Sequence, residues 1–154
     1  LMDLGCYCVN TARHLFGDNP KRVYASTIYH SDFSAESQLE GILEFPKNKT
    51  AVIDSSFLLQ HRANFEVVGE AGKITIGNAY RTEGEDVEIE ILQGEEKKVE
   101  TIKGTDEFRL EVENFSKAIR GLEDPLIAKE DSIGNMETIE ALYESGKKEI
   151  PVTV

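Results

Sequence analysis

The sequence predicts an α+β domain, built as an open, predominantly antiparallel β-sheet with helices packed on one face. Two observations carry this prediction. Six or seven segments with alternating apolar and polar residues follow one another between residues 22 and 103, as half-buried strands do. The segments on either side repeat apolar residues every three or four positions, which is typical of amphipathic helices. Strands and helices are therefore largely segregated along the chain.

The first predicted element is a helix over residues 4–16. Gly5, Val9, Ala12 and Phe16 are spaced to share one face. The sequence Gly-Asp-Asn-Pro at 17–20 then ends the helix, because glycine adopts the left-handed conformation and proline cannot continue the backbone ladder.

The strands come next. Alternation predicts strands at 22–30, 37–45 and 51–59, with a turn over 46–50, and two further pairs within 64–78 and 86–103. Gly69 and Gly72 allow the tight turn of the first of these pairs. In the second pair, apolar residues alternate with acidic ones, so one face is expected to be wet.

Two helices follow the strands. Phe108, Val112, Phe115 and Ile119 step by four, three and four, which predicts an amphipathic helix over 107–120, with Asp106 as its N-cap. A second helix is predicted over about 131–146. The last seven residues, 148–154, are expected to form a short strand or a tail.

Composition excludes several classes of function. The chain has 154 residues, enough for one domain with a sizeable core, and a net charge of −12. Without a basic cluster it is not expected to bind nucleic acid or an anionic membrane. It has no long apolar run and no signal peptide at its start. Cys6 and Cys8 are too close in sequence to form a disulfide framework, which favours a reduced, cytoplasmic setting.

Several familiar catalytic and binding motifs are missing from the sequence. It contains no GxGxxG, no Walker loop and no GxSxG elbow. His14, His30 and His61 show no metal-ligand spacing, so structural or surface roles are expected for them and no metal site is predicted.

The opening residues are the best candidates for chemistry. Asp3, Tyr7 and Asn10 stand at i, i+4 and i+7, so a helix starting here would carry them as one polar stripe, and Gly5 would permit a close backbone approach. A carboxylate and a phenol projecting together can transfer a proton to a substrate hydroxyl or carbonyl. The alternative is structural: Asp3 caps the helix, Tyr7 packs with its hydroxyl at the rim, and Asn10 lies on the surface.

The same stretch resembles a known family. LMDLGCYCVNTARHLFG resembles the DxGxH/Y segment of the Gfo/Idh/MocA oxidoreductases, and is most similar to the branch of glucose–fructose oxidoreductase and dimeric dihydrodiol or xylose dehydrogenases. FEVVGEAGKITIGN, FRLEVENFSKAIRGLEDP and SIGNMETIEALYESGKK are similar, in the same order, to the family's sheet hairpin, helix and closing helix.

The resemblance implies a function. Asp3 and Tyr7 would be the catalytic residues, binding the substrate and relaying its proton, and Asn10 would bind substrate one turn further on. The implied reaction moves a hydride between a nicotinamide, NAD or NADP, and a carbon of a small-molecule sugar or polyol. In the family, a Rossmann domain binds the nucleotide and supplies a lysine from a Glu-Lys-Pro segment.

The resemblance also implies a domain organisation. Residues 1–154 would be a single C-terminal substrate-binding and oligomerisation domain, without the N-terminal Rossmann domain. We therefore expect a cloned or trimmed fragment that is inactive by itself. Homo-oligomers would form through the open sheet face; Leu39, Leu43, Ser55 and Phe57 indicate apolar strands, but the sequence does not assign their faces. The alternative is a non-catalytic dimerisation or ligand-sensing module of the same fold.

Overall fold

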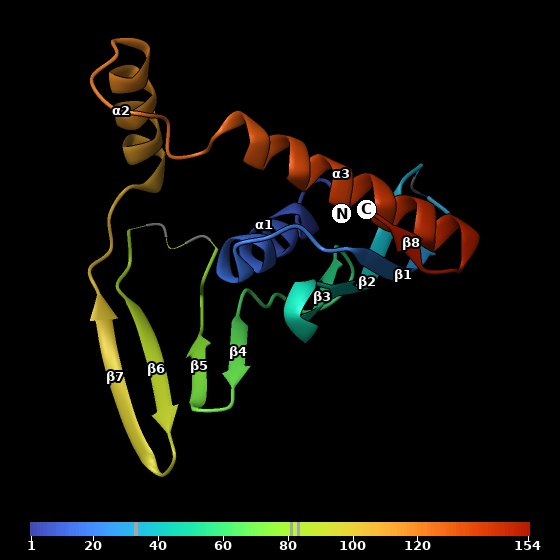
Figure 1. The fold of residues 1–154 in the computed structure, drawn as a ribbon, viewed down its shortest axis with the longest axis horizontal. Coiled ribbons are helices and arrows are strands. Elements are labelled where there is room, and N and C mark those ends of the chain that lie inside the picture. Colours follow the sequence, from blue (N-terminus) through green and yellow to red (C-terminus); the bar gives the residue numbers. More distant parts are fainter. Residues whose placement is uncertain (33, 81, 83) are drawn as a thin grey trace. The chain divides into compact units, whose positions relative to one another are not determined.

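The computed structural model describes residues 1–32, 34–80, 82 and 84–154. The chain divides into two compact units, one made of Leu1–Leu59 and Ile127–Val154 and the other of Gln60–Leu126. The second unit is therefore inserted into the first, and each is described by itself (Figure 1).

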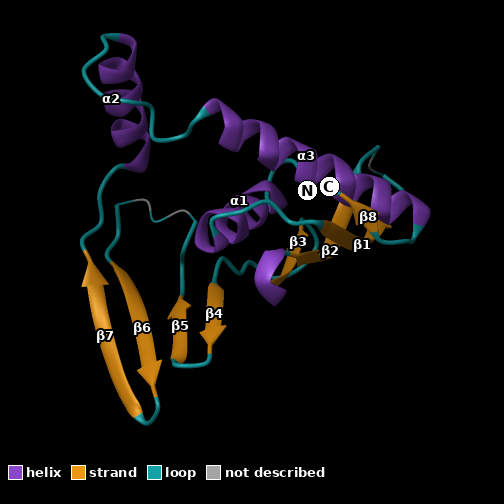
Figure 2. Cartoon of the chain, in the orientation of Figure 1, coloured by secondary structure: helices purple, strands orange, loops and turns teal. Residues whose placement is uncertain are grey.

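The first unit is a four-stranded antiparallel sheet covered by two helices. The strand order is β3-β2-β1-β8, and Figure 2 shows helices and strands in different colours. Its elements are α1 (Gly5–Phe16), β1 (Arg22–Tyr29), β2 (Glu36–Glu44), the 3₁₀ turn η1 (Pro46–Asn48), β3 (Thr50–Ser56), α3 (Lys129–Lys148) and β8 (Val152–Thr153). Helix α3 packs on β1 and β8, and α1 packs on β3 and α3.

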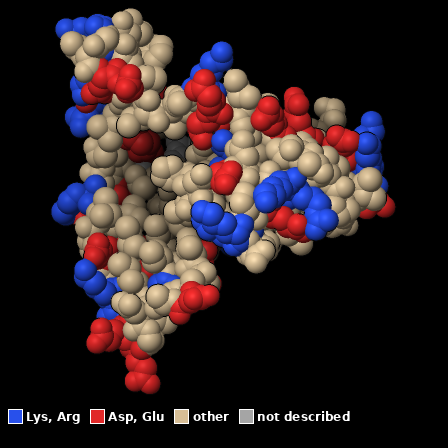
Figure 3. Space-filling model, in the orientation of Figure 1, with Lys and Arg blue, Asp and Glu red and all other residues tan. Residues whose placement is uncertain are grey.

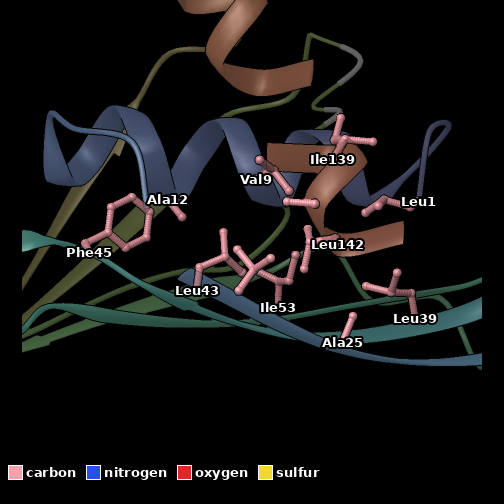
Figure 4. Packing of buried hydrophobic residues seen from close by; sticks show 12 residues of the cluster. Leu1, Val9, Ala12, Ala25, Leu39, Leu43, Phe45, Ile53, Ile139 and Leu142 are labelled. Atoms are coloured by element: carbon pink, nitrogen blue, oxygen red, sulfur yellow. The ribbon is translucent and has the colours of Figure 1, made fainter. Parts of the chain in front are cut away.

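The hydrophobic core lies between these helices and the sheet. Val9 of α1, Leu142 of α3, and Leu39 and Leu43 of β2 have no exposed surface at all. Figure 4 shows the side chains from the helices pointing toward those from the strands. The structure thus assigns Leu39 and Leu43 to the covered face. Ser55, paired with Leu39 in the ladder, lies on the same face.

The second unit is a separate sheet with one helix. Four antiparallel strands follow in order, β4 (Phe65–Gly69), β5 (Gly72–Ile76), β6 (Val87–Gln93) and β7 (Glu96–Ile102), and α2 (Glu107–Ile119) comes after them. The Asp106 side chain accepts a hydrogen bond from the Arg109 backbone N–H at 3.0 Å, which confirms the predicted N-cap. Among the described residues of this unit, no hydrophobic side chain is buried.

The structure confirms the α+β class and the antiparallel sheets. The strands nevertheless divide over two sheets, where the sequence predicted one. The third predicted strand, 51–59, ends early at Ser56, because the Ser56 hydroxyl accepts hydrogen bonds from the backbone N–H groups of Leu58 (3.0 Å) and Leu59 (3.3 Å). Such a local turn competes with the strand ladder, so β3 ends at Ser56.

Candidate active site

The segment that carries Asp3 and Tyr7 is a turn leading into α1. The Cys6 N–H donates to the Leu1 carbonyl at 2.8 Å, and the helix proper begins at Gly5. A Cβ on Gly5 would lie 2.7 Å from Leu1 Cδ1 and 2.8 Å from Ser55 Oγ. The close approach predicted for this glycine is therefore present, and it brings the start of α1 against the end of β3.

Asp3 and Tyr7 are both exposed at this end of α1, and Tyr7 has 56% of its surface exposed. The N-cap position belongs to Leu4, and no side chain caps the helix. The structural alternative in which Asp3 caps α1 is therefore wrong. The exposed carboxylate of Asp3 and the exposed phenol of Tyr7 are thus four residues apart at the start of α1.

Asn10 points elsewhere. It is half-buried, and its Nδ2 donates to Oδ2 of Asp131 in α3 at 3.2 Å. The structure therefore brings Asp3 and Tyr7 to one exposed end of α1 and directs Asn10 to a neighbouring helix.

Arg13 is a residue that sequence reasoning missed. Only 7% of it is exposed, yet its guanidinium reaches three partners from two other segments. Nη1 lies 3.0 Å from Asp131 Oδ1 and 3.4 Å from Asn135 Oδ1, and Nε lies 2.8 Å from Asn19 Oδ1. We call Asn10, Arg13, Asn19, Asp131 and Asn135 the Arg13 cluster. It joins α1 to the first half of α3.

Gly134 makes room for this cluster. A Cβ there would stand 2.6 Å from Arg13 Nη2 and 2.7 Å from Asn19 Oδ1, closer than real Cβ contacts allow. A glycine inside a helix costs about 1 kcal/mol relative to alanine, so its presence needs a reason of this kind. A glycine inside a helix is the signal in the sequence that could have pointed to this close approach.

A second polar contact joins α3 to β2. Tyr143 of α3 donates from its hydroxyl to Glu36 Oε1 at 2.8 Å. Burial and the neighbouring Glu36 carboxylate raise the pKa of Tyr143 to about 12.

Two hollows lie on the surface of the described residues. A shallow hollow near the site is lined by Leu4, Gln38, Ser56 and Phe57 among others, and a cavity of about 170 Å³ lies on the second sheet over Lys73, Leu92 and Lys97. Ligand pockets usually measure about 300–1,000 Å³. Within the described part of the chain, no three side chains of the metal-binding types come together.

Two surface properties bear on partners. On the face that Figure 3 shows, basic side chains are interspersed with acidic ones. Among the described residues, no helix combines the length and apolar character that crossing a lipid bilayer requires.

The fold and the site define the class: an α+β domain with open antiparallel sheets, whose first helix begins with an exposed carboxylate and phenol. Residues 1–75 match the model of the GFO/IDH/MocA C-terminal domain.

Known proteins match over nearly the whole chain. D-xylose 1-dehydrogenase (NADP(+)) 2 of Haloferax volcanii is 34% identical over 149 residues, which are 96% of this chain and 45% of that protein. The crystal structure of aldose-aldose oxidoreductase from Caulobacter crescentus, complexed with glycerol, has a TM-score of 0.89 and 25% identity, covering 100% of this chain and 47% of that one.

A 3-ketoreductase from Actinomadura kijaniata, in complex with NADP and TDP-benzene, has the same fold, with a TM-score of 0.87 at 18% identity over 94% of this chain and 45% of that one. This chain therefore spans about half the length of the relatives it matches.

Proposed function

We propose that this chain is the substrate-binding and oligomerisation part of an NAD(P)-dependent oxidoreductase that acts on a CH–OH group of a sugar or polyol. The observation that carries the proposal is the exposed Asp3 and Tyr7 at the start of α1, within the matched residues 1–75. The similarity to a xylose dehydrogenase and an aldose-aldose oxidoreductase supports a sugar substrate.

Tyr7 and Asp3 take different roles in this proposal. A nicotinamide, held by residues outside this chain, supplies the hydride chemistry. Tyr7 holds or moves the proton of the substrate hydroxyl through its own hydroxyl, while the Asp3 carboxylate accepts a hydrogen bond from the substrate and orients it. Asn10 is committed to Asp131, so we assign it no direct contact with substrate, although the sequence predicted one.

The test is turnover by the longer oxidoreductase that contains this chain, assayed with NAD and NADP against a panel of aldoses and polyols. Tyr7→Phe is expected to lower kcat by about 10²–10⁴, the usual contribution of a general acid–base group. Tyr24→Phe, which changes a partly exposed tyrosine on β1 in the same way, serves as the control. Equal rates for Tyr7→Phe and wild type would remove Tyr7 from the chemistry.

A second candidate function is a self-association module, and the second sheet favours it. The ladder registers place a set of apolar side chains on one of its faces. These are Phe65, Val67, Ile74, Ile76, Val87, Ile89, Ile91 and Ile102. None of them is fully buried: Ile74 and Ile102 are exposed and the other six are half-buried, while Lys98 and Glu100 of β7 lie on the same face. An apolar sheet face that is only partly covered is typical of an interface. We propose that a second copy of the chain covers it.

Light scattering tests the association. Ile89→Glu places a charge in the middle of the proposed interface and is expected to shift the chain toward monomer. Glu88→Gln, one residue earlier and therefore on the opposite face, is the control and should leave the mass unchanged. A wild-type chain that stays monomeric at high concentration would contradict the association, while leaving the catalytic proposal to the turnover assay.

A further inference from the structure

The proposed reaction uses Tyr7 but leaves open what holds α1 in one orientation. The fully buried residues of α1 are Gly5, Val9, Ala12 and Arg13, and Cys6, Cys8 and Phe16 pack only partly buried against the core. Apolar contact is non-directional, so such packing specifies the rotation of a helix about its axis only weakly.

The Arg13 cluster supplies directional contacts in its place. From α1, Arg13 and Asn10 both reach Asp131, at 3.0 Å and 3.2 Å. In the opposite direction, Nδ2 of Asn135 donates to the Cys6 carbonyl at 3.5 Å, on the residue next to Tyr7. The guanidinium presents its N–H donors in a rigid plane, so few other orientations of α1 would keep its hydrogen bonds to these partners.

We propose that Arg13 is a positioning residue: together with Asp131 and Asn135 it fixes the rotation of α1 and thereby the place of the Tyr7 hydroxyl. The catalytic consequence rests on the function proposed above. A side-chain end stands roughly 5–6 Å from the axis of its helix, so a rotation of about 20° moves it by about 2 Å. Displacements of about 1 Å already cost on the order of 10²-fold in rate.

The test removes both charges at once, because removing one would strand the other in a buried site. In the longer oxidoreductase, Arg13→Met/Asp131→Asn is expected to lower kcat at least 10-fold, with KM within about threefold of wild type and the melting temperature nearly kept. The single variant Arg13→Lys should also have a lowered kcat, because the lysine ammonium keeps the charge but lacks the planar, forked set of N–H donors of the guanidinium. A stable double variant with wild-type kcat would overturn the proposal.

The matched control is Arg22→Met/Glu44→Gln. This pair joins β1 to β2 with two hydrogen bonds of 2.9 Å, but both side chains are about half exposed. It removes the same charges from the same unit and should leave kcat unchanged. An equal loss of kcat in the control would show a general effect of charge and contradict a specific role for Arg13.

A second measurement separates this proposal from the proposed function. In the chain alone, amide hydrogen exchange over residues 5–9 is expected to be at least fivefold faster in Arg13→Met/Asp131→Asn than in wild type, and unchanged in the Arg22 control. Unchanged exchange in the double variant would overturn the positioning role. A longer protein that turns over no tested sugar or polyol would instead sink the proposed function, and the exchange rates would still decide whether Arg13 fixes α1.

Discussion

Gly134→Ala tests the Arg13 cluster through the sign of its effect on stability. Gly134 lies inside α3, where replacement of glycine by alanine ordinarily stabilises a helix by about 1 kcal/mol. Here the added Cβ would stand 2.6 Å from Arg13 Nη2, whereas tight contacts begin at 3.0 Å and ordinary ones at 3.4 Å. The guanidinium must therefore move by about 0.4–0.8 Å, the difference between these distances.

That movement weakens bonds that Arg13 cannot easily replace. Its contacts to Asp131 and Asn19 measure 3.0 Å and 2.8 Å, and the side chain is buried against other atoms. Hydrogen bonds to a charged group contribute about 1.5–3 kcal/mol each. Losing one or two of them outweighs the gain in helix propensity, so we expect a net destabilisation of about 1–3 kcal/mol.

Urea unfolding followed by far-ultraviolet circular dichroism measures the effect, provided that the m-value is unchanged. Gly77→Ala is the control: no atom lies within 4 Å of its Cβ position, and its stability should stay within about 0.5 kcal/mol of wild type. In an Arg13→Met background, where a flexible end replaces the guanidinium, Gly134→Ala should become neutral or stabilising. Stabilisation by about 1 kcal/mol in the wild-type background would refute the role assigned to Gly134.

Two further predictions concern the first unit. Leu142→Ala, at a position with no exposed surface, should lower the free energy of unfolding in urea by about 2–5 kcal/mol. Ile133→Ala, which is 45% exposed on the same helix, should lower it by less than about 1 kcal/mol, and equal losses would contradict the placement of Leu142 in the core. The pKa of Tyr143 is raised to about 12, so its contribution is complete below the unfolded value of about 10 and is lost as the pH rises toward 12. Between pH 9 and pH 11 wild type should lose more stability than Tyr143→Phe, and parallel pH profiles would contradict the raised pKa.

Local signals were enough to predict most elements of the fold. The predicted helix 4–16 begins one residue later, at Gly5, and the helix predicted over about 131–146 runs from Lys129 to Lys148. These elements are specified by neighbours three and four residues apart, by an N-cap or by a glycine, all of which a single sequence displays. The division into two sheets arises because β3 and β4, although consecutive in the chain, do not pair, and alternation alone does not reveal which strands pair.

The candidate site was predicted only in part, for a related reason. Arg13 reads in the sequence as an ordinary surface cation near the end of a helix, and its partner Asp131 is 118 residues away. Asn10 reads as surface or substrate-facing for the same reason. Ion pairs between distant segments are invisible to periodicity, because each partner is polar and each is compatible with exposure. The resemblance to a family located Asp3 and Tyr7, but it carried no information on what holds them.

Asp3 and Tyr7 are held in place by contacts at both ends of the short segment that carries them. Before Asp3, the Leu1 side chain is buried in the same core cluster as Leu142. After Tyr7, the Arg13 cluster joins α1 to α3. Leu142 and Asp131 both belong to α3, so one helix supports the segment on either side of the exposed carboxylate and phenol. Groups placed on rigid elements and fixed by directional contacts lose little free energy on orienting a substrate. The exposure of Asp3 and Tyr7 is therefore compatible with a precise site, since their backbone is fixed even though their side chains face solvent.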